Sequence, residues 1–454
     1  MTHARLLIAP LALAALLGVR DAGAQVDTTA ALRVVPPGPA GPEPRPVTLD
    51  ESVRLAQRNA PTAIQARGQL RASTAGLRAA KAAYIPNLSV NSSVAQQSPS
   101  GERLNPTTGE LQSGRWSQTQ GFNASVDLFD GFRRLYDIRA SRAQIGAAEA
   151  IVENEGNVLQ LEVRQLFYAS IAAREAEDAA RSQLTEAETQ MRVAVAKARA
   201  RIATASDSLR ASIQVGNAQL ALLTARNDRQ VADAALGRTI GTPEPVTAAP
   251  TDTAGGDIAL VVDSLALAQL VGRNPAVEAA QANVAAARAN YRAARAPYLP
   301  TLSMSYGRNI GGAGADFALY PDDPRYTGSL RFTLSYPIFN QYNREFNVIN
   351  AAVAEDNAEA QLRDARLAAQ QSLVQYLGAL RTAQQRVAIQ EATVLAAGED
   401  LRVQQTRYQL GASTVLEVVT SQNQLTQARL ALIQARLDAR VARAQLEALA
   451  GRGL

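Results

Sequence analysis

Hydrophobic residues follow a period of two in several short stretches of the chain. Every second side chain is apolar in residues 122–128, and the same alternation runs through residues 87–91 and 330–338. A period of two is typical of a β-strand with one apolar and one polar face. Each strand would have about ten residues, the length that a tilted strand needs to cross a bilayer. The candidate lipid-facing residues are Phe122, Val126, Leu128, Phe332, Leu334, Tyr336 and Ile338.

Two long stretches with a helical composition follow these strands. Residues 132–200 and 342–408 contain no proline and are rich in Ala, Gln, Glu and Arg. At 1.5 Å per residue such helices would be about 100 Å long. A heptad-like apolar seam comes next, with spacings of 4, 7 and 3 residues; it consists of Leu209, Ile213, Leu220 and Leu223. Four short strands cannot cover rods of this length, so we expect the helices to pack on each other and on other copies of the chain.

The chain contains one unit twice. Residues 218–241 align with residues 428–451 at a shift of 210, and twelve of the 24 positions are identical. The earlier part of each unit aligns at a shift of 214, where YIPNLS matches YLPTLS. Such self-similarity indicates a duplicated structural unit. Each copy is predicted to run helix, strand, strand, very long helix, long helix.

Proline explains the abrupt change from helix to strand in each copy. Pro86 and Pro300 lack the amide hydrogen that a helix needs, and their rings clash with the preceding turn. The Ala- and Arg-rich helices must therefore end at these positions, and the alternating pattern begins directly after them.

The repeats set the domain organisation. Residues 1–24 have a positive start, an apolar run and a small-residue cleavage site, which predicts a signal peptide. Residues 25–46 read as a flexible, Pro-rich leader. The first repeat would cover residues 47–241 and the second 263–451, with a linker at 242–262.

Composition excludes several classes of function. The chain has no cysteine and one histidine, His3, which lies in the predicted signal peptide. Thiol catalysis, disulfides and Cys/His zinc sites are therefore ruled out, and no cofactor, metal site or catalytic residue is expected. The net charge is +5, but the arginines are interspersed with acids, which is typical of solvated helices and argues against nucleic-acid binding.

The duplicated layout resembles the TolC-type outer membrane efflux protein family. The motifs that carry the resemblance are NAP and NP in the first helices, YIPNLS and YLPTLS at the strand entries, VDLFDGF and YPIFNQY at the strand exits, and RYQLGASTVLEVVTSQNQL at the second helical turn. Each motif is weak alone, but the ordered set occurs twice and covers roughly residues 47–451.

The resemblance implies a mainly α-helical protein with a transmembrane β portion. Three chains of four strands would form one twelve-stranded barrel in the outer membrane, continued by a long periplasmic α-barrel. This homotrimer would be a passive exit duct for small molecules. Its periplasmic end would meet a periplasmic adaptor (membrane fusion) protein that links it to an inner-membrane transporter.

Two other interpretations stay open from the sequence. Within the family, the chain could be the outer membrane component of a type I protein secretion system. In a different class, it could be a soluble periplasmic coiled-coil scaffold, because an antiparallel sheet with one wet face has the same alternation.

Candidate functional residues lie at the turns between the long helices. Asp207 and Glu417 are partners at the shift of 210, and the resemblance implies that such acids line the periplasmic aperture. Equally, Asp207 could cap a helix and Glu417 could favour a helix dipole. The candidate adaptor contacts are Ala203, Thr204, Gly411, Ala412 and Ser413.

Overall fold

The computed structural model describes residues 44–104, 109, 111–200, 204–249, 274–314, 316–321 and 324–450. The predicted signal peptide, nearly all of the leader, most of the linker and Ala203 lie outside the described residues.

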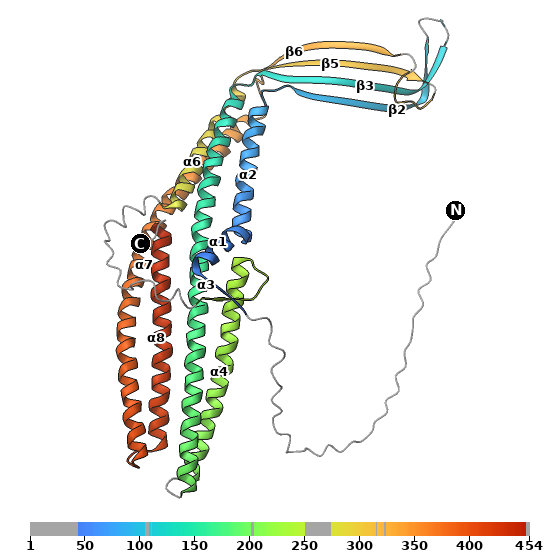
Figure 1. Ribbon diagram of the computed structural model, residues 1–454. Coiled ribbons are helices and arrows are strands. Elements are labelled where there is room, and N and C mark those ends of the chain that lie inside the picture. Colours follow the sequence, from blue (N-terminus) through green and yellow to red (C-terminus); the bar gives the residue numbers. More distant parts are fainter. Residues whose placement is uncertain are drawn as a thin grey trace, which may run out of the picture. The chain divides into compact units, whose positions relative to one another are not determined.

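The duplicated helical unit is confirmed (Figure 1). The described helices are α1 (Leu49–Asn59), α2 (Pro61–Ala82), α3 (Arg133–Arg199), α4 (Ala205–Ile240), α6 (Pro275–Ala294), the short 3₁₀ helix η2 (Ala296–Tyr298), α7 (Asn343–Gln409) and α8 (Val415–Ala450). Both α3 and α7 have 67 residues, and both α4 and α8 have 36. Each helix of the second pair begins and ends 210 residues after its counterpart in the first pair.

Four strands form one antiparallel sheet in the order β2-β3-β5-β6. They are β2 (Asn87–Leu104), β3 (Leu111–Phe129), β5 (Thr301–Gly314) and β6 (Arg325–Ser335). The β3–β5 pairing joins the two repeats, and β2 and β6 are the edges. In Figure 1 the sheet continues from the ends of the helices, since each strand is joined through a short connection to α2, α3, α6 or α7.

Strand lengths differ from the expectation of about ten residues. β2 and β3 have 18 and 19 residues and extend well beyond the alternating stretches at 87–91 and 122–128, because backbone pairing there needs no apolar alternation. At the other end β6 stops at Ser335, so the prediction of Tyr336 and Ile338 as strand residues was wrong. Between them Pro337 has no amide hydrogen to donate to a neighbouring strand.

A bulge changes the pattern near Leu128. Asp127 pairs with Ser303, but Phe129 pairs with Leu302, so Leu128 is the extra residue. Leu128 is exposed, and the regular alternation of β3 ends there.

A small parallel sheet was not expected from the sequence. β1 (Arg45–Val47) pairs with β4 (Val246–Ala248), which lies at the start of the predicted linker. Both strands pack on α3 and α4 around the main buried cluster of Val47, Leu159, Val163, Phe167, Ile171, Leu236 and Ile240. Runs of three residues carry no measurable period, which is why the sequence analysis missed them.

Asp233 of α4 links this small sheet to α3 through hydrogen bonds. Its Oδ1 accepts hydrogen bonds from Ser170 Oγ at 2.5 Å and from Thr247 Oγ1 at 3.3 Å, while Ser170 Oγ accepts from the Ala248 amide. Burial raises the pKa of Asp233, and these hydroxyls and nearby arginines oppose that rise.

The junctions between strand and long helix have the same backbone conformation in both repeats. Gly131 and Phe132 have positive φ of 68°, and Gln341 and Tyr342 follow with 58° and 61° at the shift of 210. Two consecutive left-handed residues turn the chain sharply between sheet and helix. Without glycine this conformation is strained, since a Cβ crowds the backbone there.

At each junction an arginine packs on the ring of a tyrosine, and we call these two contacts the arginine clamps. The guanidinium of Arg134 lies 4.4 Å from the ring centre of Tyr84, and that of Arg344 lies 4.2 Å from Tyr298. These tyrosines begin the YIPNLS and YLPTLS motifs, so the repeated motifs hold the end of one helix against the start of the next. Cation–π contacts of this kind are worth roughly 0.5–2 kcal/mol.

Beyond the main buried cluster, α3 and α4 meet partly through small buried residues, and several large residues of α4 are exposed. Buried alanines such as Ala187 and Ala218 let α3 and α4 approach closely. The predicted seam on α4 faces outward instead: Leu209, Ile213, Leu220 and Leu223 are 59–65% exposed. Among the described helices, none has a run long and apolar enough to span a membrane.

Candidate functional site

The candidate acids both sit at the start of a helix. Asp207 accepts hydrogen bonds from the Thr204 amide at 3.1 Å and from Thr204 Oγ1 at 2.9 Å, which forms a capping box. Glu417 accepts from Ser413 Oγ at 2.7 Å, and its own amide donates to Thr414 Oγ1 at 3.4 Å. Asp207 therefore caps the first turn of α4, as the capping alternative proposed. Glu417 lies in the first turn of α8, where a negative charge suits the helix dipole.

The predicted turn residues lie at the ends of the two helical hairpins. Gly411 has φ of 77°, a left-handed conformation that suits glycine, and it ends α7. Thr204 and Ala412 are exposed and Ser413 is half-buried. These positions are accessible, and their contact with an adaptor stays a prediction.

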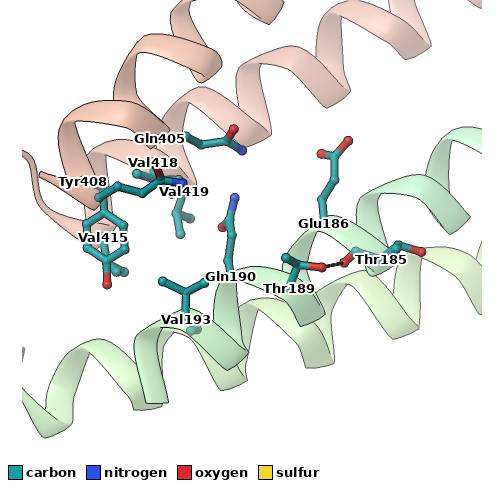
Figure 2. Close-up of a pocket in the computed structure, with 12 residues that line it drawn as sticks. Thr185, Glu186, Thr189, Gln190, Val193, Gln405, Tyr408, Val415, Val418 and Val419 are labelled. Atoms are coloured by element: carbon teal, nitrogen blue, oxygen red, sulfur yellow. Dashed lines mark hydrogen bonds between the residues drawn. The ribbon is translucent and has the colours of Figure 1, made fainter. Parts of the chain in front are cut away.

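A cavity of about 260 Å³ separates the two hairpins near these ends (Figure 2). Its apolar wall comes mainly from Val193 on α3 and from Val415, Val418 and Val419 on α8. Gln190, Glu186 and Gln405 form a polar wall. Figure 2 shows Tyr408 and Gln190 reaching into the space from opposite hairpins.

Three polar contacts bridge the hairpins around this cavity. Lys197 on α3 donates to the carbonyl of Tyr408 on α7, and its Nζ lies 3.9 Å from the ring centre of Tyr408. Gln214 Nε2 on α4 donates to Asn423 Oδ1 on α8 at 3.0 Å. Further along, Arg429 on α8 pairs with Glu186 on α3 at 3.5 Å.

Sequence analysis did not single out these bridging residues. Lys197 is one of two lysines in an arginine-rich chain, and this rarity is the one signal that could have drawn attention to it. The glutamine and asparagine partners have no signal, since such residues are common along the helices.

The phenol of Tyr408 lies partly buried at the hairpin ends. Burial raises the pKa of its phenol, and the negative charge of Asp207 adds to the rise. Its hydroxyl is buried without a hydrogen-bond partner among the described residues, as is Nε2 of Gln190. The cavity therefore presents two polar groups that no described residue satisfies and to which water can hydrogen-bond.

The sheet presents one apolar face, as the alternation predicted. Phe122, Phe332 and Leu334 are exposed on it, and Val126 is half-buried. The register places all four on one side, since Leu302 pairs with Leu334 and Met304 with both Val126 and Phe332. No group of three or more His, Cys, Asp or Glu side chains in the described part of the chain could hold a metal ion.

Known proteins are similar to this chain in sequence or in fold. A family model described as "Outer membrane efflux protein" matches residues 53–242 and 266–452. Protein CyaE of Bordetella pertussis is 27% identical over 391 residues, covering 84% of this chain and 79% of CyaE. The pyoverdine export outer membrane protein OpmQ of Pseudomonas putida is 26% identical over 390 residues, covering 84% and 81%.

A solved structure confirms the architecture. The outer membrane protein VceC of Vibrio cholerae superposes with a TM-score of 0.71 at 19% identity, covering 89% of this chain and 96% of VceC. The family model spans both repeats and most of the described residues. The chain belongs to the outer membrane efflux protein family.

Proposed function

We propose that the protein is the exit duct of a tripartite export system and carries small molecules passively across the outer membrane. The observation that supports this most is the four-stranded sheet, which has one apolar face and two unpaired edges, β2 and β6. Open edges are not tolerated in lipid, so several chains must join their sheets. Three copies would close twelve strands into one barrel.

The internal repeat predicts how the copies pair. Within the chain, Asn123 of β3 pairs with Gly307 of β5. At the shifts of 210 and 214 their counterparts are Thr333 on β6 and Ser93 on β2. The edge β6 of one copy should therefore pair with the edge β2 of the next, with Thr333 opposite Ser93.

The helices support the same assembly. Within the chain α3 of the first repeat packs against α6 and α8 of the second. By equivalence α7 of one copy would pack against α2 and α4 of the next. The exposed α4 seam of Leu209, Ile213, Leu220 and Leu223 lies where this contact requires an apolar face.

The hairpin ends would form the periplasmic end of the duct. Three chains would bring six carboxylates, Asp207 and Glu417 from each, around one axis. The turns at Thr204 and at Gly411 to Ser413 would meet a periplasmic adaptor protein, which connects the duct to an inner-membrane transporter. The similarity to OpmQ, a pyoverdine export protein, supports a small-molecule cargo.

Membrane fractionation followed by mass measurement tests this proposal. We expect the protein in the outer membrane fraction and, in mild detergent, a particle with the mass of three chains of 48.1 kDa less the removed signal peptide. A protein that stays monomeric or extracts without detergent would contradict the duct and favour a periplasmic scaffold.

Cysteine cross-linking tests the register in the same preparation. The chain has no cysteine, so Ser93→Cys with Thr333→Cys introduces the only thiols. We expect a covalent trimer on oxidation. The control pair Ser89→Cys with Thr333→Cys is displaced by four residues and should cross-link far less, because the sulfurs cannot meet.

A further inference from the structure

One charged residue interrupts the apolar face of the sheet. On β5 the even-numbered residues share a face with Leu330, Phe332 and Leu334 of β6. Arg308 belongs to this face. Within strand residues 87–96, 116–129, 301–314 and 325–335, Arg308 is the one charged side chain on the apolar side.

The surroundings of Arg308 contain aromatic groups and open space. Its guanidinium lies 5.9 Å from the ring centre of Tyr326. Across the ladder Arg308 faces Gly328, whose missing Cβ would have met no atom within 4 Å. The residue is exposed and no carboxylate of the described residues forms an ion pair with it. The first repeat has Val94 at the equivalent position.

The segment 316–321 folds over the same face beside Arg308. Gln120 of β3 donates to the carbonyl of Leu319 at 2.7 Å, and the rings of Trp116 and Phe317 meet edge-on at 5.3 Å. The hydroxyls of Tyr320 and Tyr326 lie 2.9 Å apart. Phe317, Leu319 and Tyr320 remain exposed. Aromatic rings with polar ends are typical of the boundary between lipid tails and headgroups.

The position of Arg308 along the strand places it in the outer half of the bilayer. It lies six residues beyond Leu302, or about 15 Å along the membrane normal for a strand tilted by 40°. An apolar band is about 25 Å tall, so the long side chain can extend to the headgroup level beside Tyr326.

We infer that Arg308, together with Tyr320 and Tyr326, binds the phosphate of an anionic lipid in the outer leaflet. This inference rests on the proposed outer membrane duct. No carboxylate among the described residues pairs with this guanidinium, so an anion would balance its charge on the apolar face. Its planar fork matches phosphate oxygens. One of the two tyrosine hydroxyls donates to the other, so the accepting hydroxyl supplies one further donor. The open space over Gly328 leaves room for a lipid chain.

Native mass spectrometry with lipid A tests the inference. The purified trimer is titrated in detergent with lipid A and, separately, with lipid A stripped of its phosphates. We expect Arg308→Gln to weaken lipid A binding about five-fold, the effect of one basic residue near an anionic surface. Binding of the dephosphorylated lipid should not change. Arg308→Lys should retain most of the affinity, because it keeps the charge.

Arg331 provides the matched control. It carries the same charge on β6 but lies on the opposite, polar face, opposite Ser305. Arg331→Gln should leave lipid A binding within two-fold of the wild type. Equal binding by Arg308→Gln and wild type, or an equal loss in Arg331→Gln, would overturn the inference. The same spectra report the trimer mass, so failure of the duct itself appears separately as a wild-type monomer.

Discussion

Equivalent positions in the two repeats have different neighbours. Arg164 on α3 forms an ion pair with Glu447 on α8, whereas its counterpart on α7, Val374, is 73% exposed. A Cβ on Gly131 would approach the Ala296 carbonyl at 2.4 Å, while its counterpart Gln341 is exposed. The second repeat thus covers this flank of the first repeat, whereas no described residue covers the equivalent positions Val374 and Gln341 of the second repeat.

This difference between the repeats indicates where another copy of the chain packs. The flank of α7 carries large exposed apolar residues, among them Phe346, Val353, Leu367, Val374 and Leu395, at multiples of seven residues. Such a stripe is typical of a helix that packs against another helix. The contact inside the chain is partly ionic, and the contact between copies would be more apolar.

Introducing charged residues into the α4 seam should have the largest effect on assembly. Ile213→Glu with Leu220→Glu would bury two carboxylates between copies, at a cost of several kcal/mol each. We expect the trimer to dissociate, measured by particle mass in detergent. Arg210→Glu, on the neighbouring flank of α4, is the control and should remain trimeric. Trimers in the double variant would mean that the seam faces solvent.

The two arginine clamps should differ in their contribution to stability. Arg134 also pairs with Asp130 at 2.8 Å and donates to the Ala83 carbonyl, and its side chain is only 11% exposed. We expect Arg134→Ala to cost about 3 kcal/mol, since it leaves unpaired a carboxylate, Asp130, that is only 14% exposed. Arg344 pairs with Glu345 at 3.0 Å, but that carboxylate is 34% exposed, so Arg344→Ala should cost about 1–2 kcal/mol. Thermal unfolding midpoints decide the order, and a reversed order would contradict this account of the junctions.

Removing the bridge at Lys197 should loosen the hairpin ends. Lys197→Met deletes a charged hydrogen bond worth roughly 1.5–3 kcal/mol and would favour separated hairpins about ten-fold or more. Single-channel conductance in planar bilayers should rise accordingly. The control is Arg407→Met at the equivalent position, because Arg407 donates within its own hairpin to the Ala412 carbonyl. An unchanged conductance in Lys197→Met would show that this contact does not limit opening.

The smallest effect concerns pH and the small sheet of the first repeat. The pKa of Asp233 is raised by burial, so the unfolded carboxyl ionises at lower pH than the folded one. Between these two pKa values the folded state binds more protons, and stability falls as pH rises. Asp233→Asn should remove this contribution, measured by urea unfolding from pH 3.5 to 7. The second repeat has Leu380 and Arg443 at the places of Ser170 and Asp233 and should lack it.

Much of this fold could be predicted from the sequence. Pro86 and Pro300 locate the helix ends, and the alternation in residues 122–128 identifies a strand. The effect of proline on a helix and the period of two in a strand each depend on a few neighbouring residues, so both can be recognised in the sequence. The lengths of β2 and β3 could not be predicted, since backbone pairing extends beyond the apolar pattern.

The candidate site was less accessible to sequence reasoning. Asp207 and Glu417 were found because they repeat, and the capping geometry of Asp207 followed from its position after a turn. The contacts of Lys197 with Tyr408 and of Gln214 with Asn423 join residues more than 200 positions apart. Pairs this distant depend on how the two hairpins pack, which no local pattern encodes.

The equal lengths of the long helices restrict how such a protein can evolve. One residue inserted into α3 alone would rotate everything beyond it by about 100° and displace the hairpin end by about 1.5 Å. The two hairpin ends would no longer lie at the same level. Beyond the insertion, the buried and exposed faces of α3 would point in new directions. A length change is therefore tolerated when both repeats acquire it together, or when the outward and return helices of one hairpin compensate each other. Among members of the family, the lengths of loops and termini should vary far more than the distance from the membrane to the hairpin ends.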